Sequence, residues 1–153
     1  MPTPAKLVAA VLFAALAWWV GETIVRVALP EGVRAGWLRE MLAAGGLVVG
    51  WRTIGGEATG RMRRGTTTPR AITVGIAAAA QLLVLGLVLH SFGRMIANSL
   101  DGKYTEIGRA WTAWMTFLWQ DVVLVADPVV LGTLFAGAAL VGLLAGMVGR
   151  RIG

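Results

Sequence analysis

The chain has 153 residues, of which 57% are hydrophobic and only 14% are charged, and its mean hydropathy is +0.73. This composition lies outside that of soluble domains and indicates a single membrane-embedded helical domain. The net charge of +6 does not indicate a nucleic-acid partner, because the basic residues stand beside apolar segments. The absence of cysteine excludes disulfides, thiolate metal sites and thiol redox chemistry.

The first predicted span covers residues 4–27. Thr3 and Pro4 are typical of a helix start. A cleaved signal peptide is the alternative, since Lys6 precedes an apolar core. The apolar pattern continues past Trp19 to Val27, which favours an uncleaved helix.

The second predicted span covers residues 36–54, with Trp37 and Trp51 near its ends as interfacial anchors. Arg39 is expected either to extend out of the membrane or to pair with Glu40. Small residues recur along one face and favour burial of this helix against a neighbour. They are Ala43, Gly46 and Gly50.

A basic loop is expected at residues 52–70, and its arginines face a single acid, Glu57. The loop arginines are Arg52, Arg61, Arg63, Arg64 and Arg70. Such a loop is typically cytoplasmic, and it is expected to bind anionic lipid headgroups or a cytoplasmic partner electrostatically. Lys6 and the pair Arg150-Arg151 fall on the same side, so both chain ends are expected in the cytoplasm.

The third predicted span covers residues 69–98 and is expected to end before Asp101-Gly102. Residues 105–126 follow as an amphipathic helix that is expected to lie in the membrane interface. Its polar face carries Arg109, Thr112, Thr116 and Gln120, and its apolar face carries Trp111, Trp114, Met115, Leu118 and Val122. A re-entrant or spanning segment is the alternative.

The last predicted span covers residues 128–149, after the helix-start pair Asp127-Pro128. Its small-residue stripe consists of Ala138, Gly142 and Gly146. Packing within the chain is one interpretation, and a homodimer is the other. The predicted fold is therefore all-α: a polytopic four-helix transmembrane bundle with one additional interfacial amphipathic helix.

Polar residues at membrane depth are candidates for function, and each also has a structural interpretation. Glu22 could form a proton or cation site, or pair with Arg26. His90, near Arg94, could relay protons, or bond to a neighbouring helix or to headgroups. Two further candidates are expected to have structural roles: Gln81 in a hydrogen bond between helices and Asp127 in capping the last helix.

The residue types do not predict an enzyme. One histidine and dispersed acids do not make a metal site, and no paired nucleophile and base stands out. We therefore expect no catalytic, cofactor-binding or metal-ligating residues and no cofactor.

The N-terminal run Met1-Pro2-Thr3-Pro4-Ala5-Lys6-Leu7-Val8-Ala9-Ala10, followed by Trp19 and Glu22, resembles the tellurium-resistance membrane proteins of the TrgA-like family, known from alphaproteobacteria. Gly50-Trp51-Arg52, Asp101-Gly102, the run from Asp127 to Leu134 and the terminal Arg150-Arg151 are also similar. The resemblance implies an inner-membrane protein linked to tolerance of tellurium oxyanions. It implies no active-site residues.

Three functions remain open at this point. The first is a non-enzymatic membrane factor in tellurite resistance. The second is a small oligomeric transporter or channel-like protein, in which Arg94 or Arg39 attracts an anion. The third is an accessory or assembly subunit of a larger membrane complex, docked through its small-residue stripes and its tryptophan-rich helix.

Overall fold

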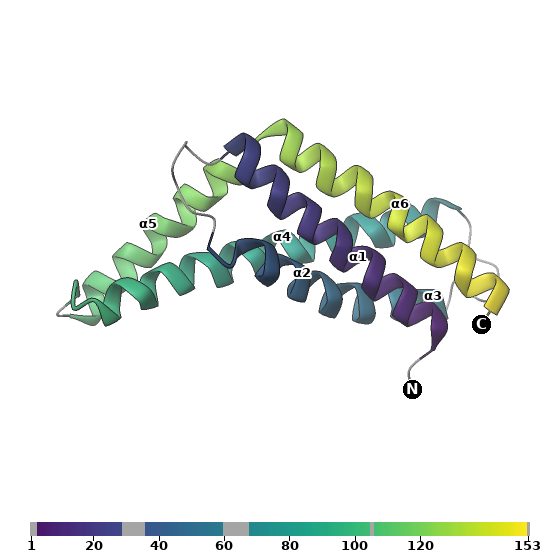
Figure 1. Ribbon diagram of the computed structural model, residues 1–153, viewed down its shortest axis with the longest axis horizontal. Coiled ribbons are helices and arrows are strands. Elements are labelled where there is room, and N and C mark those ends of the chain that lie inside the picture. Colours follow the sequence, from purple (N-terminus) through teal and green to yellow (C-terminus); the bar gives the residue numbers. More distant parts are fainter. Residues whose placement is uncertain (1–2, 29–35, 60–67, 105, 153) are drawn as a thin grey trace.

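The computed structural model describes residues 3–28, 36–59, 68–104 and 106–152, and these residues form helices with no strand among them (Figure 1). The chain begins with α1 (Pro4–Thr23), which continues as the π-helical turn η1 (Ile24–Ala28). The next helical stretch is α2 (Leu38–Val49), the π-helical turn η2 (Gly50–Ile54) and α3 (Gly55–Thr59). It is followed by α4 (Thr68–Leu100), α5 (Ile107–Val125) and α6 (Pro128–Ile152).

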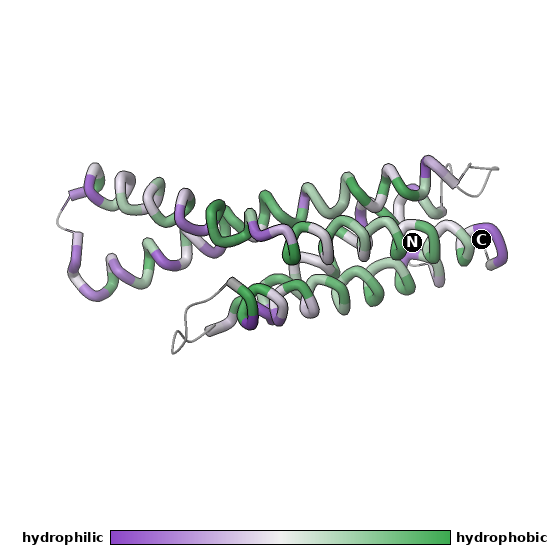
Figure 2. Tube along the Cα trace, turned by 90° about the horizontal axis from the view of Figure 1, so that it is seen from above, coloured by the Kyte–Doolittle hydropathy of each residue, from purple (hydrophilic) through white to green (hydrophobic). Residues whose placement is uncertain are grey.

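Among the described residues, three helices are long and apolar enough to cross a membrane, judged by length and composition: Pro4–Val27, Thr68–Leu100 and Pro128–Arg151. Their outer faces expose large apolar side chains such as Val11, Val84 and Leu140, each at least 60% exposed. Figure 2 shows that apolar residues dominate the bundle, whereas hydrophilic residues gather toward the tip of the α4–α5 hairpin and at the C-terminal end. The expected all-helical chain with helices able to span a membrane is confirmed.

The expected span at residues 36–54 is helical, but it is not among these three. Arg39, Glu40 and Arg52 lower its hydropathy, and α2 has only 12 residues before η2 begins. Its small residues pack as predicted: a Cβ atom on Gly46 would lie 2.6 Å from the Cβ of Ala17, and one on Gly50 would lie 2.8 Å from the Cβ of Phe13. Glycine at these positions therefore lets the α2–η2 backbone approach α1. Ala43, the third member of the stripe, is partly buried.

The small-residue stripe of α6 packs against α4 of the same chain. Gly142 lies against the carbonyl oxygen of Ala71, and Gly75 of α4 lies against the carbonyl oxygen of Ala138. Gly146 is also buried. The structure thus uses Gly142 for packing within the chain and does not leave it on an outward-facing surface.

The two ends of the loop expected at residues 52–70 are helical. Arg52 lies in η2, Arg70 lies in the first turn of α4, and the residues of α3 are helical. Ile54 and Ala58 are fully buried, and a Cβ on Gly149 of α6 would lie 2.5 Å from the carbonyl oxygen of Ala58. Because this packing stabilises the backbone, it overrides the low helix propensity of the glycines. Three arginines of the expected loop lie outside the described residues: Arg61, Arg63 and Arg64.

α4 is the longest helix, with 33 residues and a length of about 50 Å. Its first part packs against α6 and α2, and its last part extends beyond α1 and α6 to form a hairpin with α5 (Figure 1). The helix ends at Asp101-Gly102 as predicted, with Gly102 at a φ of 71° that favours glycine.

α5 extends over nearly the range expected for the amphipathic segment at residues 105–126, although Thr105 lies outside the described residues. The helix lies against the last part of α4. Trp111 and Trp119 are 60% and 68% exposed, and Thr112 on the expected polar face is also exposed. The exposed surface of α5 therefore mixes polar and apolar residues, and its packed face contains a residue that the predicted pattern left out, Asp121.

Candidate functional site

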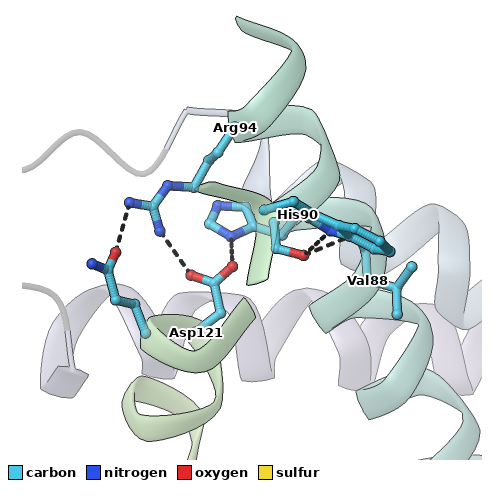
Figure 3. A network of polar contacts seen from close by, with 7 residues as sticks. Val88, His90, Arg94 and Asp121 are labelled. Atoms are coloured by element: carbon cyan, nitrogen blue, oxygen red, sulfur yellow. Dashed lines mark hydrogen bonds and ion pairs between the residues drawn. The ribbon is translucent and has the colours of Figure 1, made fainter. Parts of the chain in front are cut away.

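A cluster of polar side chains joins α4 to α5, and Asp121 is at its centre (Figure 3). The carboxylate of Asp121 is 7% exposed. Its Oδ1 accepts a hydrogen bond from Nη1 of Arg94 at 3.0 Å, and its Oδ2 lies 2.9 Å from Nδ1 of His90. A carboxylate this buried needs such partners, because an unpaired buried charge is strongly unfavourable.

The cluster continues in both directions along the two helices. Nη2 of Arg94 donates to Oε1 of Gln120 at 3.2 Å, and the Arg94 guanidinium lies 4.4 Å from the centre of the Phe117 ring. On the other side, Nε1 of Trp114 donates to the hydroxyl of Ser91 at 3.0 Å. That hydroxyl donates in turn to the carbonyl oxygen of Val88 at 3.2 Å.

Helical spacing explains why these residues meet. His90, Ser91 and Arg94 lie within four residues on α4, and Trp114 and Asp121 lie seven residues apart on α5, so each group occupies one face of its helix. The α4 face carries the cation Arg94, and the α5 face carries the anion Asp121, which accepts its hydrogen bond. The polar cluster therefore stabilises the contact between α4 and α5.

The contact with Asp121 orients the His90 ring. The carboxylate is an acceptor only, so a neutral His90 carries its proton on Nδ1 and has an unprotonated Nε2. Within the part of the chain that the structure describes, Nε2 makes no hydrogen bond. This nitrogen is available to accept a hydrogen bond from a ligand.

A cavity of about 780 Å³ lies beside the cluster, between α1, α2, α4 and α5. Its walls are mostly apolar and include Ile24, Met41, Leu82 and Leu124. The polar members of the lining come from the cluster: His90, Arg94, Gln120 and Asp121. The cavity thus combines an apolar volume with one polar wall, as small-molecule sites commonly do.

A second group of charges connects α1 and η1 to α2. Oε1 of Glu22 lies 2.7 Å from Nε of Arg26, and Oε2 of Glu22 lies 2.7 Å from Nε of Arg39. The pairing of Glu22 with Arg26 is confirmed. The expected pairing of Arg39 with Glu40 is wrong. Arg39 of α2 instead forms an ion pair with Glu22 of α1, and Glu40 is exposed.

The other sequence candidates have the structural contacts that were expected. Gln81 of α4 accepts a hydrogen bond at 2.6 Å from the hydroxyl of Thr53 in η2. Asp127 accepts a hydrogen bond at 2.8 Å from the backbone N–H of Val129 and so caps α6. At the opposite end of the bundle, Arg70 forms an ion pair at 3.2 Å with Glu57.

Asp121 was not among the residues predicted from the sequence. A usable signal was present, because Asp121 directly precedes the apolar run Val122-Val123-Leu124-Val125 and a carboxylate in such a segment needs a partner. Spacing alone could not show that the partners were His90 and Arg94, about thirty residues earlier.

Among the described residues, no group of three or more histidine, aspartate or glutamate side chains is placed to hold a metal ion. Comparison of the chain with protein-family models, with curated proteins and with solved structures gave no match.

Proposed function

We propose that the protein is an integral inner-membrane protein with four spanning helical segments: α1, the stretch α2–η2–α3, α4 and α6. The proposal adds the α2 segment to the three apolar helices because it lies along α1 and contacts α4. Its charged Arg39 is neutralised by Glu22, which lowers the free energy needed to place it in lipid. In this arrangement the α4–α5 hairpin projects from the outer side of the bundle, so α5 does not lie flat in the membrane interface.

We further propose that this membrane protein acts without catalysing a reaction, as a factor in tolerance of tellurium oxyanions. The tellurite role comes from the resemblance of the N-terminal run and of the Asp127-to-Leu134 segment. The observation that supports a non-transport role is the pairing of the polar groups between helices. Asp121 holds Arg94, Glu22 holds Arg39, and Thr53 holds Gln81, so these side chains stabilise helix contacts.

An anion transporter is less well supported by this geometry. Such a protein would need Arg94 or Arg39 to attract the anion, and each of these cations lies within 3.0 Å of a carboxylate oxygen. A carboxylate paired with an arginine reduces the attraction of that arginine for a second anion.

A specific observation favours the accessory-subunit role as a second candidate. The α4–α5 hairpin exposes large apolar side chains near its tip, with Leu100 at 84% and Ile107 at 92% exposed. Exposed apolar surface of this kind is typical of a contact with lipid or with a partner protein.

A tellurite-tolerance assay tests the first proposal and separates it from the second. The gene is deleted in the bacterium that encodes the protein, and the strain is complemented with the wild type or with the hairpin-tip variant Leu100→Ser plus Ile107→Ser. Loss of tolerance on deletion and its rescue by both proteins supports a non-docking tellurite factor. Rescue by the wild type alone supports action through a partner at the hairpin. Unchanged tolerance on deletion contradicts the tellurite role.

A further inference from the structure

We propose that the cavity between α1, α2, α4 and α5 binds an uncharged amphiphile with a hydroxyl-bearing aromatic head and a long apolar chain, the chemistry of a membrane hydroquinone. The inference does not rest on the tellurite role. It rests on the volume, the lining and the charge balance of the cavity, and on the free nitrogen of His90.

The volume and lining favour an apolar chain. A cavity of about 780 Å³ lies within the range of sites that hold one small organic ligand. Leucine, isoleucine, valine and methionine side chains from α1, η1, α2, α4, α5 and α6 form most of the wall. A chain that enters from the bilayer exchanges one apolar environment for another, so its specificity must come from the polar wall.

The charge balance favours an uncharged head. Arg94 and Asp121 are the two charged residues of the lining when His90 is neutral, and they form an ion pair at 3.0 Å. An anionic head would meet Asp121, and a cationic head would meet Arg94. Neither charge would be balanced without breaking the existing pair.

The hydrogen-bonding groups favour a head that carries a hydroxyl group. Nε2 of neutral His90 is an acceptor, because Nδ1 donates to Asp121. Gln120 uses its carbonyl oxygen to accept from Arg94, so its amide nitrogen remains a donor. A hydroquinone can donate one hydroxyl to His90 and accept at another oxygen from Gln120, whereas the oxidised quinone has no hydroxyl to donate.

Space for a flat ring exists on the α4 side of the cavity. Gly93 lies one turn beyond His90, lines the cavity and is exposed, and apart from the adjoining part of its own helix no atom lies within 4 Å of where its Cβ would be. Trp37 also lines the cavity and is 85% exposed, so its indole is not occupied by packing in the described part of the chain. An aromatic head could stack against this indole.

Anaerobic binding of decylubiquinol to the purified full-length protein in detergent tests the proposal. Bound ligand is measured after gel filtration. The wild type is expected to bind about one equivalent. Gly93→Leu places a side chain in the cavity and is expected to weaken binding at least about tenfold. The matched control is Gly132→Leu, which has the same open space around its Cβ but lies on α6 outside the cavity lining.

A second comparison tests the contact with the head independently of the cavity volume. The wild type is expected to prefer decylubiquinol to oxidised decylubiquinone by about tenfold, the effect of roughly one hydrogen bond. His90→Phe is expected to abolish that preference while keeping a flat aromatic ring at this position. Equal binding by Gly93→Leu and Gly132→Leu, or equal affinity of the wild type for both redox forms, overturns the proposal. Competition by stearate or monoolein as strong as that by the hydroquinone also overturns it.

Discussion

Asp121 shows how one side chain can determine the contact between two helices. It is 5% exposed, and each of its two carboxylate oxygens bonds to a side chain of α4. Its two partners are more exposed than Asp121, since the side chain of Arg94 is 39% exposed and that of His90 is 32% exposed. Replacing Asp121 is therefore expected to cost more stability than replacing either of its partners.

Asp121→Asn is expected to lower the free energy of unfolding by about 1–3 kcal/mol, because a neutral amide loses the charge-assisted bonds while retaining the shape of the side chain. Unfolding in detergent, followed by tryptophan fluorescence, measures this change. Asp101→Asn is the matched control, since the side chain of Asp101 is 66% exposed and lies 3.5 Å from Lys103. Its effect should stay within about 0.5 kcal/mol. Equal effects of the two substitutions would contradict a central role for Asp121.

Glu22 has a comparable position at the contact of α1 with α2. Glu22→Gln should lower the melting temperature more than Glu40→Gln, because Glu22 pairs with both Arg26 and Arg39 whereas Glu40 is exposed. A thermal unfolding series of the two variants in detergent tests this order. A lower melting temperature for Glu40→Gln than for Glu22→Gln would instead support the pairing of Arg39 with Glu40 that was expected from the sequence.

At the scale of the helices, close contact between backbones decides the packing of α4 and α6. Gly75 and Gly142 lie against carbonyl oxygens of the opposing helix, and neither position has room for a methyl group. Contacts of this kind gain dispersion energy and exclude lipid. They also make the interface sensitive to the addition of a single carbon atom.

Gly142→Ala is expected to destabilise the protein by about 1–3 kcal/mol through overpacking against Ala71. Gly132→Ala in the same helix has open space and should be neutral or slightly stabilising, by up to about 1 kcal/mol. Unfolding free energies of the two variants in one detergent provide the comparison. A stable Gly142→Ala variant that has lost a dimer would show instead that Gly142 faces a second copy of the chain.

The arrangement of the whole molecule places both chain ends together. The start of α1 and the end of α6 lie at the same end of the bundle as α3, and the tip of the α4–α5 hairpin lies at the opposite end (Figure 1). The terminal residues Arg150 and Arg151 therefore lie at the α3 end, and Lys103 and Arg109 lie at the hairpin tip. With the basic end in the cytoplasm, the hairpin tip is expected outside it.

Cysteine labelling tests this orientation cleanly, because the natural chain has no cysteine. A membrane-impermeant maleimide should label Lys103→Cys in intact spheroplasts, whereas Arg151→Cys should react only after permeabilisation. Both positions are exposed, so a difference in labelling reports the side of the membrane. Labelling of Arg151→Cys alone in intact spheroplasts would invert the topology, and equal labelling of the two would contradict a membrane-spanning bundle.

The sequence was enough to predict the helical class, the three apolar helices, the cap at Asp127 and the end of α4 at Asp101-Gly102. These features follow from hydropathy and from local backbone preferences, which act within a few residues. It also indicated the Glu22–Arg26 pair, which lies within one helical turn.

The packing of the helices determines which distant groups meet. It paired Arg39 with Glu22, brought Asp121 to His90 and Arg94, and continued the helix through Arg52 into α3, where a loop was expected. Each outcome depends on contacts between residues far apart in the chain. At these helix contacts, side-chain burial and the pairing of charges outweigh the backbone preferences of the local sequence. An unpaired charge or an unfilled volume between packed helices would be unfavourable.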